Sequence, residues 1–206
     1  MIVLSYLKLW CRMNRDIVLR YFRDPPELTT PRLLLRRLKK SDYRDMYEYA
    51  CNPDVTRFLT WKPHPNPTWT MRYLAYVATR YRAGEFYDWA IILRENQKMI
   101  GTCGFTSFSY DHNSAEIGYV LNPSYWGRGI ALEAVRAVMD VGFRVLNLHR
   151  IEAKFILGNE QSRRVMEKAG MTFEGFHRKA MKIKGKYETV GYCSILCEEF
   201  LTDNNN

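Results

Sequence analysis

Glu116 to Glu133 reads EIGYVLNPSYWGRGIALE, and it is the most informative stretch of the sequence. It begins with the pattern of a strand, turns at Asn122-Pro123, and continues as a helix that opens with Gly127 to Ala131 (GRGIA). The first N–H groups of a helix have no partner inside it, and the helix dipole is positive at that end. Glycines let the backbone approach a diphosphate closely. The stretch therefore predicts a phosphate cradle between a strand and a helix.

This cradle motif is weak evidence when taken alone, because many helices begin at a glycine turn for structural reasons. It is not a Walker loop, since no Gly-Lys-Ser/Thr occurs, and it is not a Rossmann fingerprint, since GxGxxG is absent. Arg128 either adds positive charge to the cradle or is a solvated arginine on an exposed turn. The surrounding sequence has to decide between a phosphate cradle and a purely structural helix start.

The segments on either side predict a mixed α/β domain. We expect a strand, two helices, three strands, a helix, a strand, a helix and two final strands. This order gives a mostly antiparallel seven-stranded sheet with helices on both faces, in which the fifth strand can lie parallel to the fourth. The expected strands are 32–38, 86–94, 99–108, 115–121, 150–157, 173–183 and 186–196, and the expected helices are 41–51, 68–82, 127–145 and 160–169.

The length of 206 residues fits one domain with short appendages. We expect an N-terminal helical extension over 1–26, the domain over 27–200 and a disordered tail over 201–206. Leu4, Leu7, Trp10 and Cys11 would form one face of an amphipathic helix that packs on the domain or on another subunit, so a homodimer stays open. The first apolar run is too short to span a membrane, and no small-residue cleavage site follows. We therefore expect no membrane partner.

Composition narrows the class of protein further. The hydrophobic fraction of 47% argues against a disordered chain. The net charge of +9 suits nucleic acid, an acidic protein surface or a phosphorylated small molecule, without choosing among them. Five cysteines without CxxC spacing indicate reduced thiols and a cytoplasmic location. The four histidines are scattered, so we expect no metal.

Trp126 to Ala131 resembles the acetyl-CoA motif of the GNAT superfamily, usually written Q/R-x-x-G-x-G/A, with Trp126 in place of Gln or Arg. A tryptophan at this point is typical of the branch that includes the ribosomal-protein N-terminal acetyltransferases. Further segments resemble that branch in the same order, so the resemblance covers about Leu28 to Leu196. They are Thr29 to Leu33, His149 to Ala153, Asn159 to Arg164, and Lys168 to Met171 with Glu174-Gly175, where Met171 replaces Phe.

The resemblance implies a GNAT fold and transfer of an acetyl group from acetyl-CoA to a primary amine. Strands four and five would splay apart, with acetyl-CoA in the gap, and main-chain groups of the fourth strand would bind the pantetheine amides. Asn159 would bond the pantetheine arm or cap its helix, or do both. The implied cofactor-binding residues are Tyr119, Val120, Leu121, Trp126, Gly127, Arg128, Gly129, Ile130, Ala131, Asn159 and Ser162.

Direct attack of an amine on the thioester needs no enzyme nucleophile, so Cys103 is interpreted as a core residue. Glu116 is the candidate general base, on the fourth strand, and its alternative is a solvent-facing carboxylate. Glu152 is the reserve. Many GNAT enzymes place a tyrosine acid where this chain has Met166, so Ser162 is the candidate proton donor, a cofactor ligand or only a helix-turn serine.

The acceptor stays open between two classes of amine. Removing a proton at pH 7 costs about 1 kcal/mol for an α-amine and about 4.6 kcal/mol for a lysine, so a weakly armed site favours a protein N-terminus. The alternative is a small amine such as an antibiotic, a polyamine or an amino acid. Candidate walls of the acceptor site are Trp61, Tyr73, Tyr87, Phe108 and Phe176.

A third reading, from a different class, is a nucleic-acid-binding or regulatory module. It would use clustered basic residues near the first strand. They are Arg32, Arg36, Arg37, Lys39 and Lys40. Since the motif order favours an enzyme, we expect nucleic acid not to be the partner.

Overall fold

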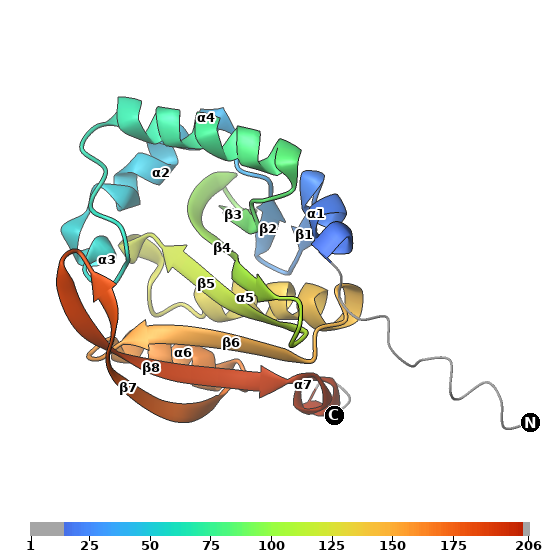
Figure 1. The fold of residues 1–206 in the computed structure, drawn as a ribbon. Coiled ribbons are helices and arrows are strands. Elements are labelled where there is room, and N and C mark those ends of the chain that lie inside the picture. The colour runs from blue at the N-terminus through green and yellow to red at the C-terminus, as the bar shows by residue number, and fades with distance from the viewer. Residues whose placement is uncertain (1–14, 204–206) are drawn as a thin grey trace, which may run out of the picture.

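The computed structural model describes residues 15–203 (Figure 1). The expected helix face of Leu4, Leu7, Trp10 and Cys11 lies outside these residues. Seven α-helices are described: α1 Arg15–Arg23, α2 Tyr43–Ala50, α3 Pro53–Thr56, α4 Pro67–Ala83, α5 Ile130–Asp140, α6 Glu160–Lys168 and α7 Cys197–Asp203. The expected helix over 127–145 is divided, because α5 passes into a π-helical segment at Val141–Val145.

One mixed sheet of eight strands runs in the order β1-β2-β3-β4-β5-β6-β8-β7. β5 and β6 pair in parallel, and every other described pair is antiparallel. The mixed α/β fold class is confirmed. The strands are β1 Leu28–Thr29, β2 Leu33–Arg36, β3 Asp88–Leu93, β4 Lys98–Ser109, β5 Ser114–Leu121, β6 Arg150–Ile156, β7 Thr172–Ile183 and β8 Lys186–Leu196.

The predicted count of seven strands is wrong by one, because β1 was not expected. β1 has only two residues, which pair with Leu34 and Leu35 of β2. The turn between them is closed by Thr30, whose N–H donates to the Leu33 carbonyl at 3.0 Å. Two residues are too short to show the alternation of polar and apolar side chains that reveals a strand.

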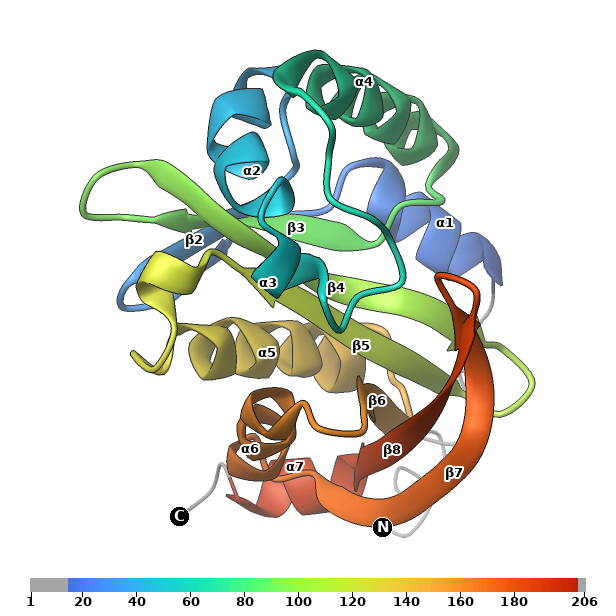
Figure 2. The same ribbon diagram turned by 90° about the vertical axis from the view of Figure 1, so that its left-hand side faces the viewer.

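Helices cover both faces of the sheet, as Figure 2 shows with α2 and α4 above β3 and β4 and with α5 and α6 below β5. The larger core lies against α1, α5, α6 and α7. The smaller core lies against α2 and α4 and reaches Ala90 and Ile92 of β3 and Val120 of β5. Side chains alternate along each strand, so neighbours in sequence belong to different cores.

The two ends of the described chain are integrated into the domain. In α1, Val18 and Phe22 are fully buried, and the Phe22 ring packs edge-on against Trp89 at 5.3 Å. In α7, Phe200 is buried against Phe143. This helix extends to Asp203, so residues 201–203 of the expected tail are helical in the structure. Within residues 15–203, no helix is both long and apolar enough to cross a bilayer.

The expected splay of the fourth and fifth strands is found between β5 and β6. Their pairing begins at Ser114 with Arg150 and ends at Glu116 with Glu152. Beyond that point β5 pairs only with β4, and β6 pairs only with β8. The rest of β5 therefore borders an opening in the sheet.

Candidate active site

The turn before α5 has the geometry of an anion cradle. Gly127 and Gly129 have φ angles of +74° and +73°, in the left-handed region that favours glycine. A Cβ at Gly127 would meet no atom within 4 Å, so the turn is open on that side. The first bond of α5 runs from the Glu133 N–H to the Gly129 carbonyl, which leaves the amides at the start of the helix without helical partners. These features fit a diphosphate.

Arg32 and Glu133 hold this turn against β2, and we call this pair the latch. The Arg32 guanidinium donates from Nη1 to the Arg128 carbonyl at 2.8 Å and from Nε to the Glu133 carboxylate at 2.6 Å. The second oxygen of Glu133 accepts from the Thr30 hydroxyl at 2.6 Å and from the Arg32 N–H at 2.9 Å. Arg32 thereby also brings a second positive charge beside Arg128. The sequence interpretation missed this role, although the Thr29 to Leu33 segment that it singled out contains both donors.

Main-chain groups of β5 alternate between β4 and the opening. The Asn122 N–H donates to the Ile100 carbonyl of β4, and Val120 lies opposite Thr102 in the same register. By this alternation the main chain of Val120 also points to β4, whereas that of Tyr119 and Leu121 points to the opening. The Leu121 carbonyl accepts from the Trp126 indole at 2.8 Å. Of the three residues expected to bind pantetheine amides, Tyr119 is therefore the best placed, and Val120 is directed away by the β-ladder.

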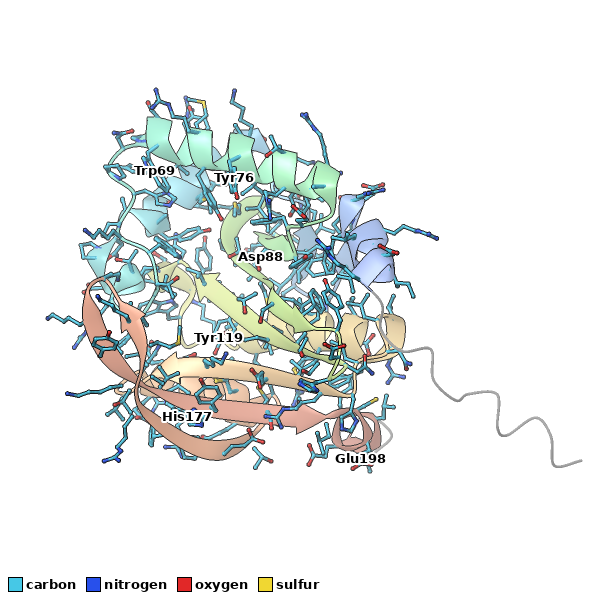
Figure 3. The ribbon with its side chains drawn as sticks, viewed as in Figure 1. Trp69, Tyr76, Asp88, Tyr119, His177 and Glu198 are labelled. Carbon is cyan, nitrogen blue, oxygen red and sulfur yellow. The ribbon has the colours of Figure 1, made fainter. Side chains whose placement is uncertain are left out.

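A tyrosine hydroxyl crosses the opening. The Tyr119 hydroxyl lies 2.9 Å from Ser162 Oγ and donates to the Ser162 carbonyl at 3.0 Å (Figure 3 labels Tyr119). Burial raises the pKa of Tyr119, and the hydrogen bond with Ser162 opposes this rise. The hydroxyl therefore stays protonated at neutral pH and can donate a proton. Met166, which stands where many relatives carry a tyrosine acid, is buried in the core.

Asn159 caps α6, since its side-chain oxygen accepts from the Ser162 N–H at 3.3 Å. The cap fixes the first turn of the helix and hence the place of Ser162. Its amide nitrogen is left for another partner, so the two roles expected for Asn159 are compatible.

Glu116 lies on the other face of β5 and is part of a charge cluster. Its carboxylate accepts from Lys154 Nζ at 2.6 Å, and Lys154 also lies 3.6 Å from Glu152. Burial alone would lower the pKa of Lys154, but the hydrogen bond and charge of Glu116, with the charge of Glu152, raise it overall. Both candidate base carboxylates thus face the same ammonium group.

A model of the acetyltransferase (GNAT) domain matches residues 32–172. The chain belongs to the GNAT acetyltransferase family. It is therefore an acyltransferase, and enzymes of this family use acetyl-CoA.

Relatives of this GNAT enzyme fall into more than one acceptor class. An uncharacterized N-acetyltransferase of Bacillus licheniformis is 34% identical over 84% of this chain and 97% of its own length. A spermidine N(1)-acetyltransferase of Escherichia coli is 25% identical over 82% of this chain and 89% of its own. Among solved structures, the ribosomal-protein α-N-acetyltransferase RimL with coenzyme A has a TM-score of 0.71 at 21% identity, covering 83% of this chain and 98% of that one. The last likeness is one of fold.

Only two of the five aromatic residues expected to line the acceptor site of this GNAT enzyme lie on the face that carries Glu116. Trp61 and Tyr73 pack with the smaller core, beside the buried His64. The other three belong to the opposite face because side chains alternate along a strand. Tyr87 and Phe108 pack on Phe22, and Phe176 packs on Phe155 and Phe173.

His64 is a structural member of this aromatic group. Its Nδ1 lies 2.9 Å from the Thr70 hydroxyl, and the ring packs 4.2 Å from that of Trp69. Burial lowers the pKa of His64 to about 4. The imidazole is therefore neutral at pH 7, and the group forms an uncharged aromatic wall.

The basic cluster near the first strand is largely neutralised. Arg36 forms a two-pronged ion pair with the buried Asp42 at 2.8 and 2.9 Å. Arg37 pairs with Asp24 at 3.2 Å, and Arg32 is held by Glu133. These contacts remove the main support for a nucleic-acid-binding module. Cys103 is fully buried, as expected of a core residue, and burial raises the pKa of its thiol.

Proposed function

We propose that this enzyme acetylates the α-amine of a protein N-terminus by direct attack on the thioester of acetyl-CoA. The observation that carries the choice of acceptor is the pairing of Glu116 with Lys154 at 2.6 Å. The carboxylate nearest the opening is already engaged by a cation, so Glu116 is poorly suited to remove a proton from the amine. Deprotonation at pH 7 costs about 1 kcal/mol for an α-amine but about 4.6 kcal/mol for a lysine.

The cofactor roles follow from the geometry of the opening. The amides of Gly127 to Ala131 hold the pyrophosphate, and Arg128 and Arg32 add positive charge beside them. Tyr119 offers main-chain groups to the pantetheine, and Asn159 offers its side-chain amide. Acetyl-CoA supplies the activated acyl group when it is bound. The amine approaches from the face that carries Glu116, which we term the acceptor face.

Tyr119 and Ser162 form the proton donor for the leaving sulfur. Their hydroxyls are 2.9 Å apart at the opening, so a proton that one hydroxyl gives up can be replaced from the other. The tyrosine acid that the helix lacks at Met166 is thus replaced by a tyrosine from β5.

Replacing Tyr119 by phenylalanine should lower kcat about tenfold. This is less than the hundredfold typical of a lone general acid, because the Ser162 hydroxyl remains. Ser162→Ala should have a similar effect, and the double variant should lose little more than about another tenfold. Steady-state kinetics at saturating acetyl-CoA measures both. An unchanged kcat in Tyr119→Phe would remove the pair from the chemistry.

A panel of acceptors tests the choice of amine. Thiol release is followed with peptides that differ only in a free or blocked α-amine, with an N-blocked lysine peptide, and with spermidine. We expect the peptide with the free α-amine to be acetylated. The lysine peptide should react at about a tenth of that rate or less. Preference for the lysine peptide or for spermidine would contradict the proposed acceptor while leaving the acetyltransferase in place.

A small polyamine is the second candidate acceptor. It is favoured by the relative named as a spermidine acetyltransferase and by acidic groups on the acceptor face, namely Glu116, Glu152 and Asp88. Two of these, Glu116 and Glu152, share the single positive charge of Lys154, which is why we place this candidate second.

A further inference from the structure

The acceptor face carries one more carboxylate, Asp88, at the start of β3. Its residue is half-buried, and it forms no ion pair or side-chain hydrogen bond with the described residues. Asp88 lines a pocket of about 360 Å³ beside the end of α4. Two other charged residues of this pocket, Arg80 and Glu85, are paired with each other at 2.8 Å. Asp88 is therefore the free carboxylate of the described part of this pocket.

The register of the sheet directs Asp88 toward the opening. Asp88 lies opposite Gly104 on β4, and Gly104 lies opposite Gly118 on β5. A Cβ at residue 104 would be 2.5 Å from Asp88 Oδ1, so the carboxylate leans over β4. Strands lie about 4.8 Å apart, so Gly118 is one strand spacing beyond Gly104. Gly118 is followed by Tyr119, whose main chain borders the opening.

Gly104 and Gly118 lie in one row across the sheet, and neither places a side chain over β4 or β5 on this face. Any side chain at Gly104 would collide with the Asp88 carboxylate, and one at Gly118 would collide with the Thr106 methyl group at 2.8 Å. Thr106 also lines the pocket, and its hydroxyl donates to the Glu116 carbonyl at 3.4 Å. The pocket and Asp88 thus lie on the face that carries Glu116, with β4 and β5 between them and the opening. In Figure 3, Asp88 lies below α4, and Tyr119 lies farther down toward β6.

We propose that Asp88 is the proton acceptor of the reaction, and that it takes the proton of the acceptor amine through water held over Gly104 and Gly118. Asp88 takes a proton from the α-ammonium through this water, which leaves a neutral amine. The amine nitrogen bonds to the thioester carbon, the carbon–sulfur bond breaks, and the sulfur takes a proton from the Tyr119–Ser162 pair. The proton that the nitrogen loses on forming the amide restores the pair, and Asp88 releases its own proton to solvent. This inference rests on the proposed acetyl transfer to an α-amine.

The proton affinity of Asp88 suits such an amine. Burial raises the pKa of Asp88 to about 7. Transfer from an α-ammonium of pKa about 8 is then unfavourable by only about tenfold, whereas transfer from a lysine of pKa about 10.4 is unfavourable by more than about 1,000-fold. The titratable and charged groups that face Asp88 are Tyr49 from α2, Tyr73, Arg80 and Tyr81 from α4, Glu85 after α4, and Cys103 from β4.

Among residues 15–203, the cation that lines the pocket of Asp88 is Arg80, and it is paired with Glu85. After burial, the charge of Asp88 is the next cause that raises the pKa of both Tyr73 and Cys103. Arg80 is tied to Glu85, which also lies 3.9 Å from Arg15. Glu116, by contrast, has Lys154 at 2.6 Å. A carboxylate without a partner can take up a proton near neutral pH, which a base needs.

The test is the pH dependence of kcat for the full chain, at saturating acetyl-CoA and with whichever amine of the panel reacts best. The profile of kcat is chosen because kcat/KM also carries the ionisation of the free amine. The wild type should lose activity as the pH falls through about 7. Asp88→Asn should lower kcat about 100-fold at pH 7.5 and abolish this acid limb, with an unchanged KM for acetyl-CoA. Asp88→Glu should recover part of kcat with a displaced limb.

Two further variants and one outcome of Asp88→Asn make the result decisive. Asp24→Asn removes the same charge from an exposed site, and it should leave kcat and the limb as in the wild type. Glu116→Gln should keep the limb near pH 7, and loss of the limb in this variant alone would transfer the role to Glu116 and overturn the proposal. A limb that persists in Asp88→Asn, with the loss confined to acceptor KM, would also overturn it, because Asp88 would then only bind the amine.

Two measurements separate failure of the proposal from other failures. Thermal unfolding and acetyl-CoA affinity show whether Asp88→Asn is folded, and if it is not, an unmoved limb in Asp88→Glu overturns the proposal. If spermidine proves to be the best acceptor, the proposed α-amine is wrong, yet the role of Asp88 is still tested on that amine.

Discussion

Gly129→Glu should lower the affinity for acetyl-CoA by about 100-fold or more. Gly129 has a φ of +73°, where a side chain costs about 1–2 kcal/mol of backbone strain. The new carboxylate would stand at the positive end of α5, where it would occupy the place of a phosphate and repel the remaining one. About 3 kcal/mol in total corresponds to this loss. Calorimetric titration with acetyl-CoA measures it directly.

The matched control for this variant is Gly185→Glu. Gly185 also has a positive φ, of +88°, and a Cβ there would meet no atom within 4 Å. It lies in the β7–β8 turn, far along the chain from the cradle, so the affinity for acetyl-CoA should stay as in the wild type. Should Gly129→Glu bind as tightly as this control, the pyrophosphate does not lie at the turn before α5.

The cradle and the splay could be predicted because their signals are local. Gly127 and Gly129 stand at a helix start, and their positive φ angles are what a glycine allows and other residues resist. The ends of β5 and β6 are set by alternating patterns of seven or eight residues. The confirmed family follows from the same stretch, since the motif order spans the residues that the family model matches.

What could not be predicted depends on contacts between distant parts of the chain. Arg32 contacts Arg128 and Glu133, which lie about a hundred residues away in the sequence. Neither local sequence indicates that the other is its partner. The Tyr119–Ser162 contact depends on which face of β5 the Tyr119 side chain takes and on where α6 places Ser162.

Asp88 illustrates the same limit. One aspartate before a tryptophan reads as an ordinary strand start, and only its register with Gly104 reveals it. Tyr87 was assigned to the acceptor wall because aromatic content alone does not give the face of a strand. Its neighbour Asp88 takes that face, and Tyr87 turns to the core of α1.

The latch also makes a prediction about stability. Glu133→Ala should lower the free energy of unfolding by about 2 kcal/mol at pH 7, because it leaves the Thr30 hydroxyl, the Arg32 N–H and the Arg32 guanidinium without their acceptor. We use the lower part of the range for charged hydrogen bonds, since Arg32 is about half exposed. Urea unfolding measures the difference, which corresponds to a fall of roughly 4–8 °C in the melting temperature.

The pH dependence of this difference identifies its origin. Burial alone would raise the pKa of Glu133, but the hydrogen bonds from Thr30 and Arg32 and the charge of Arg32 lower it overall. A carboxyl group with a depressed folded pKa contributes its stability above the ordinary value of 4.5 and loses it as the pH falls through the folded value. The wild type and Glu133→Ala should therefore differ fully at pH 7 and converge in acid. Glu160→Ala, an exposed first-turn glutamate of α6, should cost less than about 1 kcal/mol. An equal loss in both variants would mean that the helix dipole, and not the latch to β2, accounts for the effect of Glu133.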